Sequence, residues 1–229
     1  MQDYQAFAKK VLNVDFSDIE LLVTAFTHRS YVNEHRKSVR EHNERLEFLG
    51  DAVLELVVTQ YLYTKFNQPE GVLTNWRSAL VRTESIGAAA TKLDFEPLLR
   101  LSRGEKRGTK RARDQILANC YEAVIGAIYL DQGYAVAQKF IETSLLSTFG
   151  EILASGSWMD AKSQLQEVVQ SREDFTPTYK VLSEEGPDHD KIFTVGVYVN
   201  SRLLGKGTGP SKQVGQQKAA EEALASYNK

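Results

Sequence analysis

The 229-residue chain has a single cysteine, Cys120, so it cannot form an internal disulfide bond. This scarcity is typical of proteins from a reducing compartment. The sequence also lacks any apolar run near the ~20 residues that a membrane-spanning helix needs. Charged residues occur throughout residues 1–30, which argues against a secretory signal. We therefore expect a cytoplasmic protein with no membrane partner.

A net positive charge is also absent. The formal net charge is −2 and the pI is about 6.1, so composition alone does not indicate a nucleic-acid partner. Any binding to a polyanion must come from local clusters of lysine and arginine. An acidic metal site would itself lower the net charge, so a metal-dependent nuclease remains compatible with this balance.

Residues 1–152 are predicted to form a helical domain. Apolar residues recur at helical spacing within residues 19–26, 46–57 and 116–128, and no alternating strand pattern competes with them. This part of the chain therefore predicts a mainly α N-terminal domain.

The composition changes at residues 153–157, where small residues without periodicity predict a short linker. Residues 158–229 then favour a small α+β domain. A helix is expected after Asp160, a plausible N-cap. Strands are expected at 178–182, at 192–199 and after a turn near Ser201, followed by a helix over 211–226. The predicted order is α-β-β-β-α.

Three carboxylates, Glu44, Glu47 and Asp51, are spaced by three and four residues, which places them on one face of a helix. Apolar residues surround them, and like charges at these spacings repel one another. A hard cation such as Mg²⁺ would compensate such a cluster. A solvated acidic stripe on an amphipathic helix explains the spacing equally well.

A second candidate helix contains Asn119 and Glu122, three residues apart within an apolar run. A buried glutamate without a partner is costly, so Glu122 is expected to be paired or metal-bound. Gly126 costs about 1 kcal/mol relative to alanine within a helix. Its presence predicts a close approach of two helices.

Residues 43–54, Asn-Glu-Arg-Leu-Glu-Phe-Leu-Gly-Asp-Ala-Val-Leu, closely resemble the signature of the ribonuclease III family. The resemblance extends over nearly the whole chain. Further segments resemble the family's other motifs, namely residues 27–34, 70–74, 77–81, 104–113 and 116–118. Residues 160–229 resemble the double-stranded-RNA-binding domain of bacterial members.

The resemblance implies a homodimeric endoribonuclease that uses Mg²⁺, with Mn²⁺ as a plausible substitute. Such enzymes cut double-stranded RNA to 5′-phosphate and 3′-hydroxyl ends with short 3′ overhangs. The expected substrates are precursors of ribosomal RNA, together with transfer and messenger RNA.

By motif position the implied metal ligands are Glu47, Asp51, Asn119 and Glu122, of which Asp51 and Glu122 would also be catalytic. Glu44 and Glu70 match positions near the RNA but outside direct metal contact. Phe48 occupies the position of an aromatic residue that inserts into the partner subunit, and ordinary core packing is an equal alternative for it.

Asn119 departs from the family pattern, which most often has aspartate there. An amide oxygen can bind a hard cation but brings no formal charge, so weaker metal affinity is expected. Natural variation and an engineered change both explain the asparagine. If it disables the metal site, the chain is instead a double-stranded-RNA-binding protein of the same fold.

The resemblance also implies RNA contacts in the second domain. Ser163, Gln166 and Glu167 on its first helix and His189 in the following loop would meet minor-groove hydroxyls. At the start of the last helix, Ser211 and Lys212 would meet phosphates. Glutamines at positions 213 and 216 replace the family's usual basic residues, which predicts weaker binding and a shallower salt dependence.

A basic segment, residues 100–113, precedes the Asn119 helix, and Gly104 and Gly108 predict that it forms a loop. It is expected either to contact substrate phosphates or to be an ordinary solvated loop. A helical protein-interaction module with an acidic face is a third class of function, but it explains neither the second motif at Asn119 and Glu122 nor the second domain.

Overall fold

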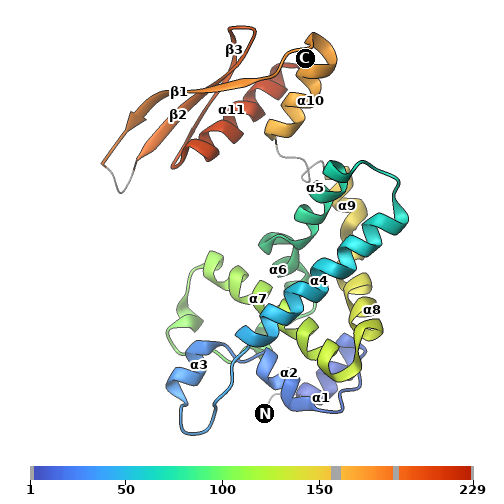
Figure 1. Ribbon diagram of the computed structural model, residues 1–229. Coiled ribbons are helices and arrows are strands. Elements are labelled where there is room, and N and C mark those ends of the chain that lie inside the picture. Colours follow the sequence, from blue (N-terminus) through green and yellow to red (C-terminus); the bar gives the residue numbers. More distant parts are fainter. Residues whose placement is uncertain (1–2, 156–160, 188–190, 228–229) are drawn as a thin grey trace. The chain divides into compact units, whose positions relative to one another are not determined.

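The computed structural model describes residues 3–155, 161–187 and 191–227. The chain divides into two compact units, Met1–Trp158 and Met159–Lys229, and each is considered by itself (Figure 1). Within the described residues, no helix combines the length and the apolarity required to cross a membrane.

The first unit is helical, as predicted. Its helices and short helical turns are α1 (Tyr4–Phe7), a π-helical turn (Ala8–Leu12), α2 (Ile19–Ala25), α3 (Arg29–Glu34), α4 (Glu44–Lys65), α5 (Glu70–Val81), α6 (Thr83–Lys92), 3₁₀ turns at Glu96–Leu98 and Glu105–Arg107, α7 (Lys110–Gln132), α8 (Tyr134–Ser144), a 3₁₀ turn at Leu146–Thr148, and α9 (Phe149–Ser155).

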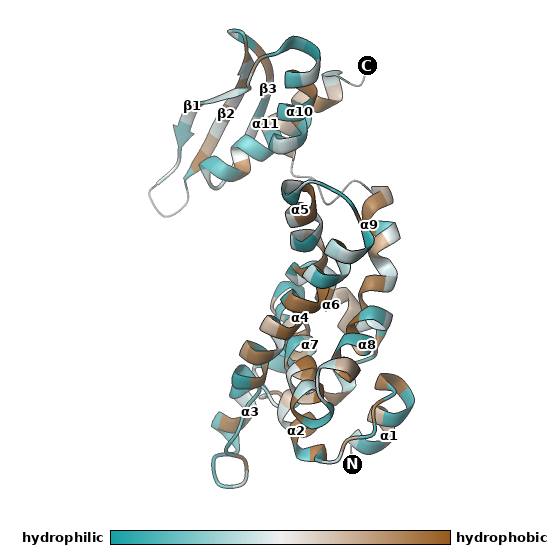
Figure 2. Cartoon of the chain, turned by 45° about the vertical axis from the view of Figure 1, so that its right-hand side comes forward, coloured by the Kyte–Doolittle hydropathy of each residue, from teal (hydrophilic) through white to brown (hydrophobic). Residues whose placement is uncertain are grey.

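The two longest helices of the described residues, α4 and α7, lie side by side and form the centre of this unit (Figure 1). One hydrophobic core surrounds them, and α7 contributes fully buried residues from Ala123 to Ile128. Hydrophobic and hydrophilic stretches alternate along α4 in Figure 2, as expected for a helix that buries only one side.

Two boundaries differ from the sequence prediction. The basic segment is only partly a loop, because a 3₁₀ turn occupies Glu105–Arg107 and α7 already begins at Lys110. Thr109 explains this early start, since its side chain accepts a hydrogen bond from the Ala112 N–H and so caps the helix. Helix α9 continues into the expected linker as far as Ser155, because small residues such as alanine also favour helix.

The second unit has the predicted α-β-β-β-α order. Its elements are α10 (Ala161–Glu173), β1 (Thr178–Glu185), β2 (Ile192–Val199), β3 (Arg202–Gly209) and α11 (Lys212–Tyr227). The sheet is antiparallel in the order β1-β2-β3. Both helices pack on one of its faces, around a core that includes Leu165, Val197 and Ala223. The predicted fold class is therefore confirmed.

Candidate active site

The acidic end of α4 is anchored through its first residues. Asn43, only 2% exposed, donates its backbone N–H to the Thr27 carbonyl at 2.9 Å. Its own carbonyl accepts from the Glu47 N–H at 2.8 Å. Acidic side chains are favourable in a first helical turn because they oppose the positive end of the helix dipole. Glu44 and Glu47 both lie in that turn.

Two glycines bring α4 and α7 into backbone contact. A Cβ atom added at Gly50 would lie 1.7 Å from the Glu122 carbonyl oxygen, and one added at Gly126 would lie 2.3 Å from the Leu46 carbonyl oxygen. No side chain fits at either position. The close approach predicted from Gly126 is confirmed, and it places Glu47 and Asp51 beside Glu122.

The carboxyl group of Glu122 carries the strongest electrostatic perturbation of this site. Burial, together with the smaller effects of the charges of Asp51 and Glu47, raises its pKa from the ordinary 4.5 to about 8. Since both neighbours belong to α4, the two helices turn three carboxylates towards a common space.

The electrostatic interaction among Glu47, Asp51 and Glu122 does not mean that a metal-binding site is already formed. In the part of the chain that the structure describes, no three His, Cys, Asp or Glu side chains are arranged as a metal-ion site. The carboxylates can raise one another's pKa without forming a metal site, because charges interact over about 10 Å, whereas Mg²⁺ requires its oxygen ligands at about 2.1 Å. The side chains would have to rotate towards one another to share one cation.

Asn119 is held between two neighbours. Gln115 donates its Nε2–H to Asn119 Oδ1 at 2.7 Å. Burial and the charge of Glu44 raise the pKa of Glu47, and hydrogen bonding to Asn119 opposes that rise. An ionised carboxylate only accepts hydrogen bonds, so Asn119 must turn its NH₂ group towards Glu47 and its oxygen towards Gln115. The sequence reasoning missed Gln115, although its four-residue spacing from Asn119 was a usable signal.

The other two acids of the sequence prediction have local partners. Glu44 forms ion pairs with Arg29 at 3.5 Å and, when the imidazole is protonated, with His42 at 3.9 Å. Glu70 accepts a hydrogen bond from the Thr74 hydroxyl at 2.9 Å within α5. Neither contact joins the group formed by Glu47, Asp51 and Glu122.

Phe48 projects from the surface with 82% of its area exposed, so its alternative reading as a core residue is wrong. It borders a surface cavity of about 740 Å³. The lining combines apolar residues of α2, α4 and α7 with charged residues before and within α4: Leu21, Thr24, Arg40, Glu41, His42, Glu44, Arg45, Leu46, Phe48, Leu49 and Leu130.

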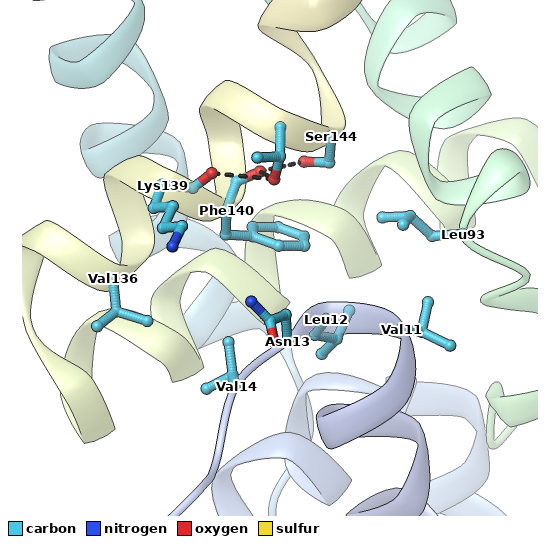
Figure 3. Close-up of a pocket in the computed structure, with 10 residues that line it drawn as sticks. Val11, Leu12, Asn13, Val14, Leu93, Val136, Lys139, Phe140 and Ser144 are labelled. Carbon is cyan, nitrogen blue, oxygen red and sulfur yellow. Dashed lines mark hydrogen bonds between the residues drawn. The ribbon is translucent and has the colours of Figure 1, made fainter.

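A separate cavity of about 300 Å³ lies between the N-terminal segment and α8 (Figure 3). Its hydroxyl groups are satisfied within α8, where Thr143 donates to the Lys139 carbonyl at 3.0 Å and Ser144 to the Phe140 carbonyl at 2.6 Å. The lining includes none of the carboxylates described above.

In the second unit, the predicted RNA-contact residues have different surroundings. Gln166 and Glu167 are exposed on α10, Ser163 is half-buried, and His189 lies outside the described residues. Ser211 caps α11 by accepting a hydrogen bond from the Val214 N–H at 3.3 Å.

Lys212, the first residue of α11, is engaged within its own unit. Its ammonium pairs with Glu184 at 3.2 Å and lies 5.5 Å from the ring centre of Phe193. Gln216 accepts a hydrogen bond from Lys162 Nζ at 2.8 Å and so links α11 to α10.

Comparisons with known proteins agree with this geometry. The family described as Ribonuclease-III-like matches residues 18–149, and the Double-stranded RNA binding motif matches residues 161–227. The two units thus define a nuclease domain joined to a domain that binds double-stranded RNA.

The individual relatives are similar over most of the chain. Ribonuclease 3 of Enterococcus faecalis is 47% identical over 219 residues, covering 95% of each chain. Ribonuclease 3 of Streptococcus gordonii is 44% identical, covering 93% of this chain and 92% of the relative. The nuclease domain of ribonuclease III from Campylobacter jejuni is 36% identical with a TM-score of 0.56, covering 66% of this chain and 96% of that one.

The chain belongs to the ribonuclease III family. The predicted function, an endoribonuclease acting on double-stranded RNA, is confirmed at this level, and no observation favours the non-cleaving alternative.

Proposed function

We propose that this chain hydrolyses double-stranded RNA with a divalent metal ion, Mg²⁺ or in its place Mn²⁺, bound between α4 and α7. The observation that supports the proposal most is the convergence of Glu47, Asp51 and Glu122 around the glycine contact. Three carboxylates in a common space need a compensating charge, and an all-oxygen donor set suits Mg²⁺ or Mn²⁺.

In this proposal Glu47, Asp51, Asn119 and Glu122 hold the metal ion. A metal ion in such a site activates water and neutralises charge on the scissile phosphate. Asp51 would orient the attacking water, and its exposure is consistent with access from solvent. Glu122 is more buried, and its carboxylate interacts electrostatically with Asp51 and Glu47. Asn119 now turns its NH₂ group towards Glu47 and its oxygen towards Gln115, so its amide oxygen would reach the ion only after the side-chain amide turns over.

The active form is proposed to be a homodimer. A two-fold interface presents the same patch on both subunits, so a projecting group and its pocket can belong to one surface. Phe48 and the cavity beside it fit this requirement, because both lie on the same patch. A solved nuclease domain from Campylobacter jejuni is described as having a flexible region involved in dimer formation.

The two domains are proposed to extend over residues 1–152 and 158–229. The first would cleave the RNA duplex and the second would bind it. In the second, Ser163, Gln166, Glu167 and His189 would read the minor groove, while Ser211 and Lys212 would contact phosphates. Fewer cations at the start of α11 predict a weak phosphate contact there, especially as Lys212 already pairs with Glu184.

The proposed products are duplexes with 5′-phosphate and 3′-hydroxyl ends and short 3′ overhangs. Precursors of ribosomal RNA are the proposed main substrates, with structured transfer and messenger RNAs as others. The proposed location is the cytoplasm, which is consistent with the single cysteine.

A cleavage assay on a labelled RNA duplex tests the proposal. Cleavage should require Mg²⁺ or Mn²⁺, stop on chelation, and fall by several orders of magnitude in Glu122→Gln, which keeps the shape of the side chain. Glu20→Gln, a change at an exposed glutamate of α2, is the matched control and should cleave normally. If the unaltered chain bound duplex RNA but did not cleave it with either metal, the non-cleaving alternative would replace this proposal.

A further inference from the structure

Two segments far apart in the sequence run side by side next to α3. The His28 N–H donates to the Arg100 carbonyl at 3.1 Å, and the Arg100 N–H donates to the Phe26 carbonyl at 2.9 Å. The chain beyond Arg100 is the basic segment that leads into α7. Helix α3 therefore lies against the start of this segment.

Side chains of α3 bind the backbone of the basic segment. Ser30 Oγ accepts from the Ser102 N–H at 3.1 Å and lies 2.8 Å from His28 Nδ1. Both carboxylate oxygens of Glu34 lie 3.3 Å from the Arg103 backbone nitrogen and share its N–H. These bonds satisfy backbone donors of an irregular turn, so they fix the course of the chain there.

Two arginines of the segment are used to build it. The Arg100 guanidinium lies 4.5 Å from the ring centre of Tyr31 and donates to the Thr27 hydroxyl at 3.1 Å. Arg113, on α7, donates to the Glu105 and Lys106 carbonyls at 3.4 and 2.9 Å. The turn is thus held from α3 on one side and from α7 on the other.

The remaining cations of the segment point into solvent. They are exposed, and within the described residues none of them has an acidic partner at ion-pair distance: Arg103, Lys106, Arg107, Lys110 and Arg111. Five exposed cations within nine residues form a surface that fits a polyanion. We call these five residues the cationic turn.

The cationic turn leads into the helix face that carries the acidic site. Arg111 and Glu122 are separated by eleven residues, about three helical turns, so they lie on one face of α7 roughly 16 Å apart along its axis. Gln115 and Asn119 lie between them on the same side. A duplex bound at the carboxylates can therefore also reach the cationic turn.

We propose that Ser30 and Glu34 are positioning residues that hold the cationic turn in the conformation that binds phosphates of the RNA duplex. This inference rests on the proposed function. Neither residue touches the RNA in this scheme; each acts through the backbone of residues 102 and 103.

The sign of the effect separates this role from a simple charge effect. Glu34 is an anion among cations, so by Coulomb's law alone its removal would strengthen RNA binding. If Glu34 positions the turn, its removal weakens binding, because the cations lose their fixed spacing. The two readings predict opposite changes in the dissociation constant for RNA.

The experiment measures binding of the full chain to an RNA duplex in EDTA, over a series of salt concentrations. Glu34→Ala should weaken binding roughly 3- to 10-fold. It should also make the slope of log K against log salt shallower by an amount that corresponds to about one to two phosphate contacts. Ser30→Ala should act in the same direction. Glu34→Gln, which keeps an acceptor oxygen for the Arg103 N–H, should bind within about twofold of the unaltered chain. Glu20→Ala removes the same charge from α2 and should leave the slope unchanged.

The same substitution in a chain that lacks three of these cations tests whether Glu34 acts on RNA binding through the cationic turn. In a chain with Arg103, Lys106 and Arg107 all changed to alanine, Glu34→Ala should produce no further loss of slope. An unchanged or stronger affinity of Glu34→Ala would overturn the inference, as would a lower melting temperature with an unchanged slope. Should Glu34→Ala fail to fold, Glu34→Gln decides, since tighter binding by that variant would indicate charge alone. If the unaltered chain did not bind duplex RNA, the proposed function itself would fail.

Discussion

Replacing Gly50 with alanine tests whether the contact between α4 and α7 assembles the acidic site. Real Cβ atoms do not approach other heavy atoms closer than 3.0 Å, yet a Cβ at residue 50 would lie 1.7 Å from the Glu122 carbonyl oxygen. The two helices would have to part by roughly 1.3 Å at this point. Glu122 would then move away from Glu47 and Asp51 together with the backbone that carries it.

Gly50→Ala is expected to lower first the stability of the chain and second its rate of cleavage. Overpacking of this kind costs about 1–3 kcal/mol of stability, which for a chain of this size lowers the melting temperature by about 2–12 °C. A displacement of about 1 Å at a reacting centre also lowers the rate on the order of 100-fold. Thermal unfolding in EDTA measures the first part. Single-turnover cleavage below the transition, with the enzyme in excess over RNA, measures the second.

Gly150→Ala is the matched control, because nothing lies within 4 Å of a Cβ at that position of α9. Alanine is also the better helix former by up to about 1 kcal/mol. This variant should therefore melt at the same or a higher temperature and cleave normally. If Gly50→Ala cleaved within about twofold of the unaltered chain, the close approach would not be what places the carboxylates.

Three further predictions concern single side chains. The folded-state pKa of Glu122, about 8, exceeds its ordinary 4.5. The contribution of Glu122 to stability is therefore full below about pH 4.5 and is lost as the pH rises towards 8. In EDTA, Glu122→Gln should flatten the pH dependence of urea unfolding between pH 5 and 9, and an unaltered slope would refute this. Asn119→Asp adds a ligand charge and should lower the Mg²⁺ concentration for half-maximal cleavage several-fold, while loss of cleavage would remove Asn119 from the metal ligands. Phe48→Ala should shift the chain from dimer to monomer in sedimentation at micromolar concentration, and a persistent dimer would disprove its interface role.

Much of the fold could be predicted from the sequence because the signals are local. Helical periodicity identified the region around α4 and α7, and alternating β-branched and aromatic residues identified β2. The start of α7 was missed because Gly104 and Gly108 indicated a loop. Thr109, directly before the first helical residue, was the better signal, since a threonine side chain can cap a helix.

The candidate site was less accessible to reasoning from spacing. Gly126 correctly predicted a close helix contact, but nothing in the sequence indicated that Gly50 is the residue it meets. Contacts between residues some seventy positions apart depend on tertiary packing, which local patterns do not encode. The pairing of the α4 carboxylates with Glu122 therefore came from the family resemblance and not from periodicity. The orientation of Asn119 by Gln115 required the geometry.

The net charge of −2 was a poor guide to the partner because charges act locally in salt solution. The Debye length is about 8 Å at physiological ionic strength, whereas Arg111 and Glu122 are roughly 16 Å apart on α7. The carboxylates therefore do not cancel the attraction of the cationic turn for phosphates. One helix can carry an anionic site that attracts a metal ion and, three turns away, a cationic surface that attracts RNA. It follows that raising the salt concentration should weaken RNA binding at the cationic turn well before it weakens metal binding at the partly buried site around Glu122.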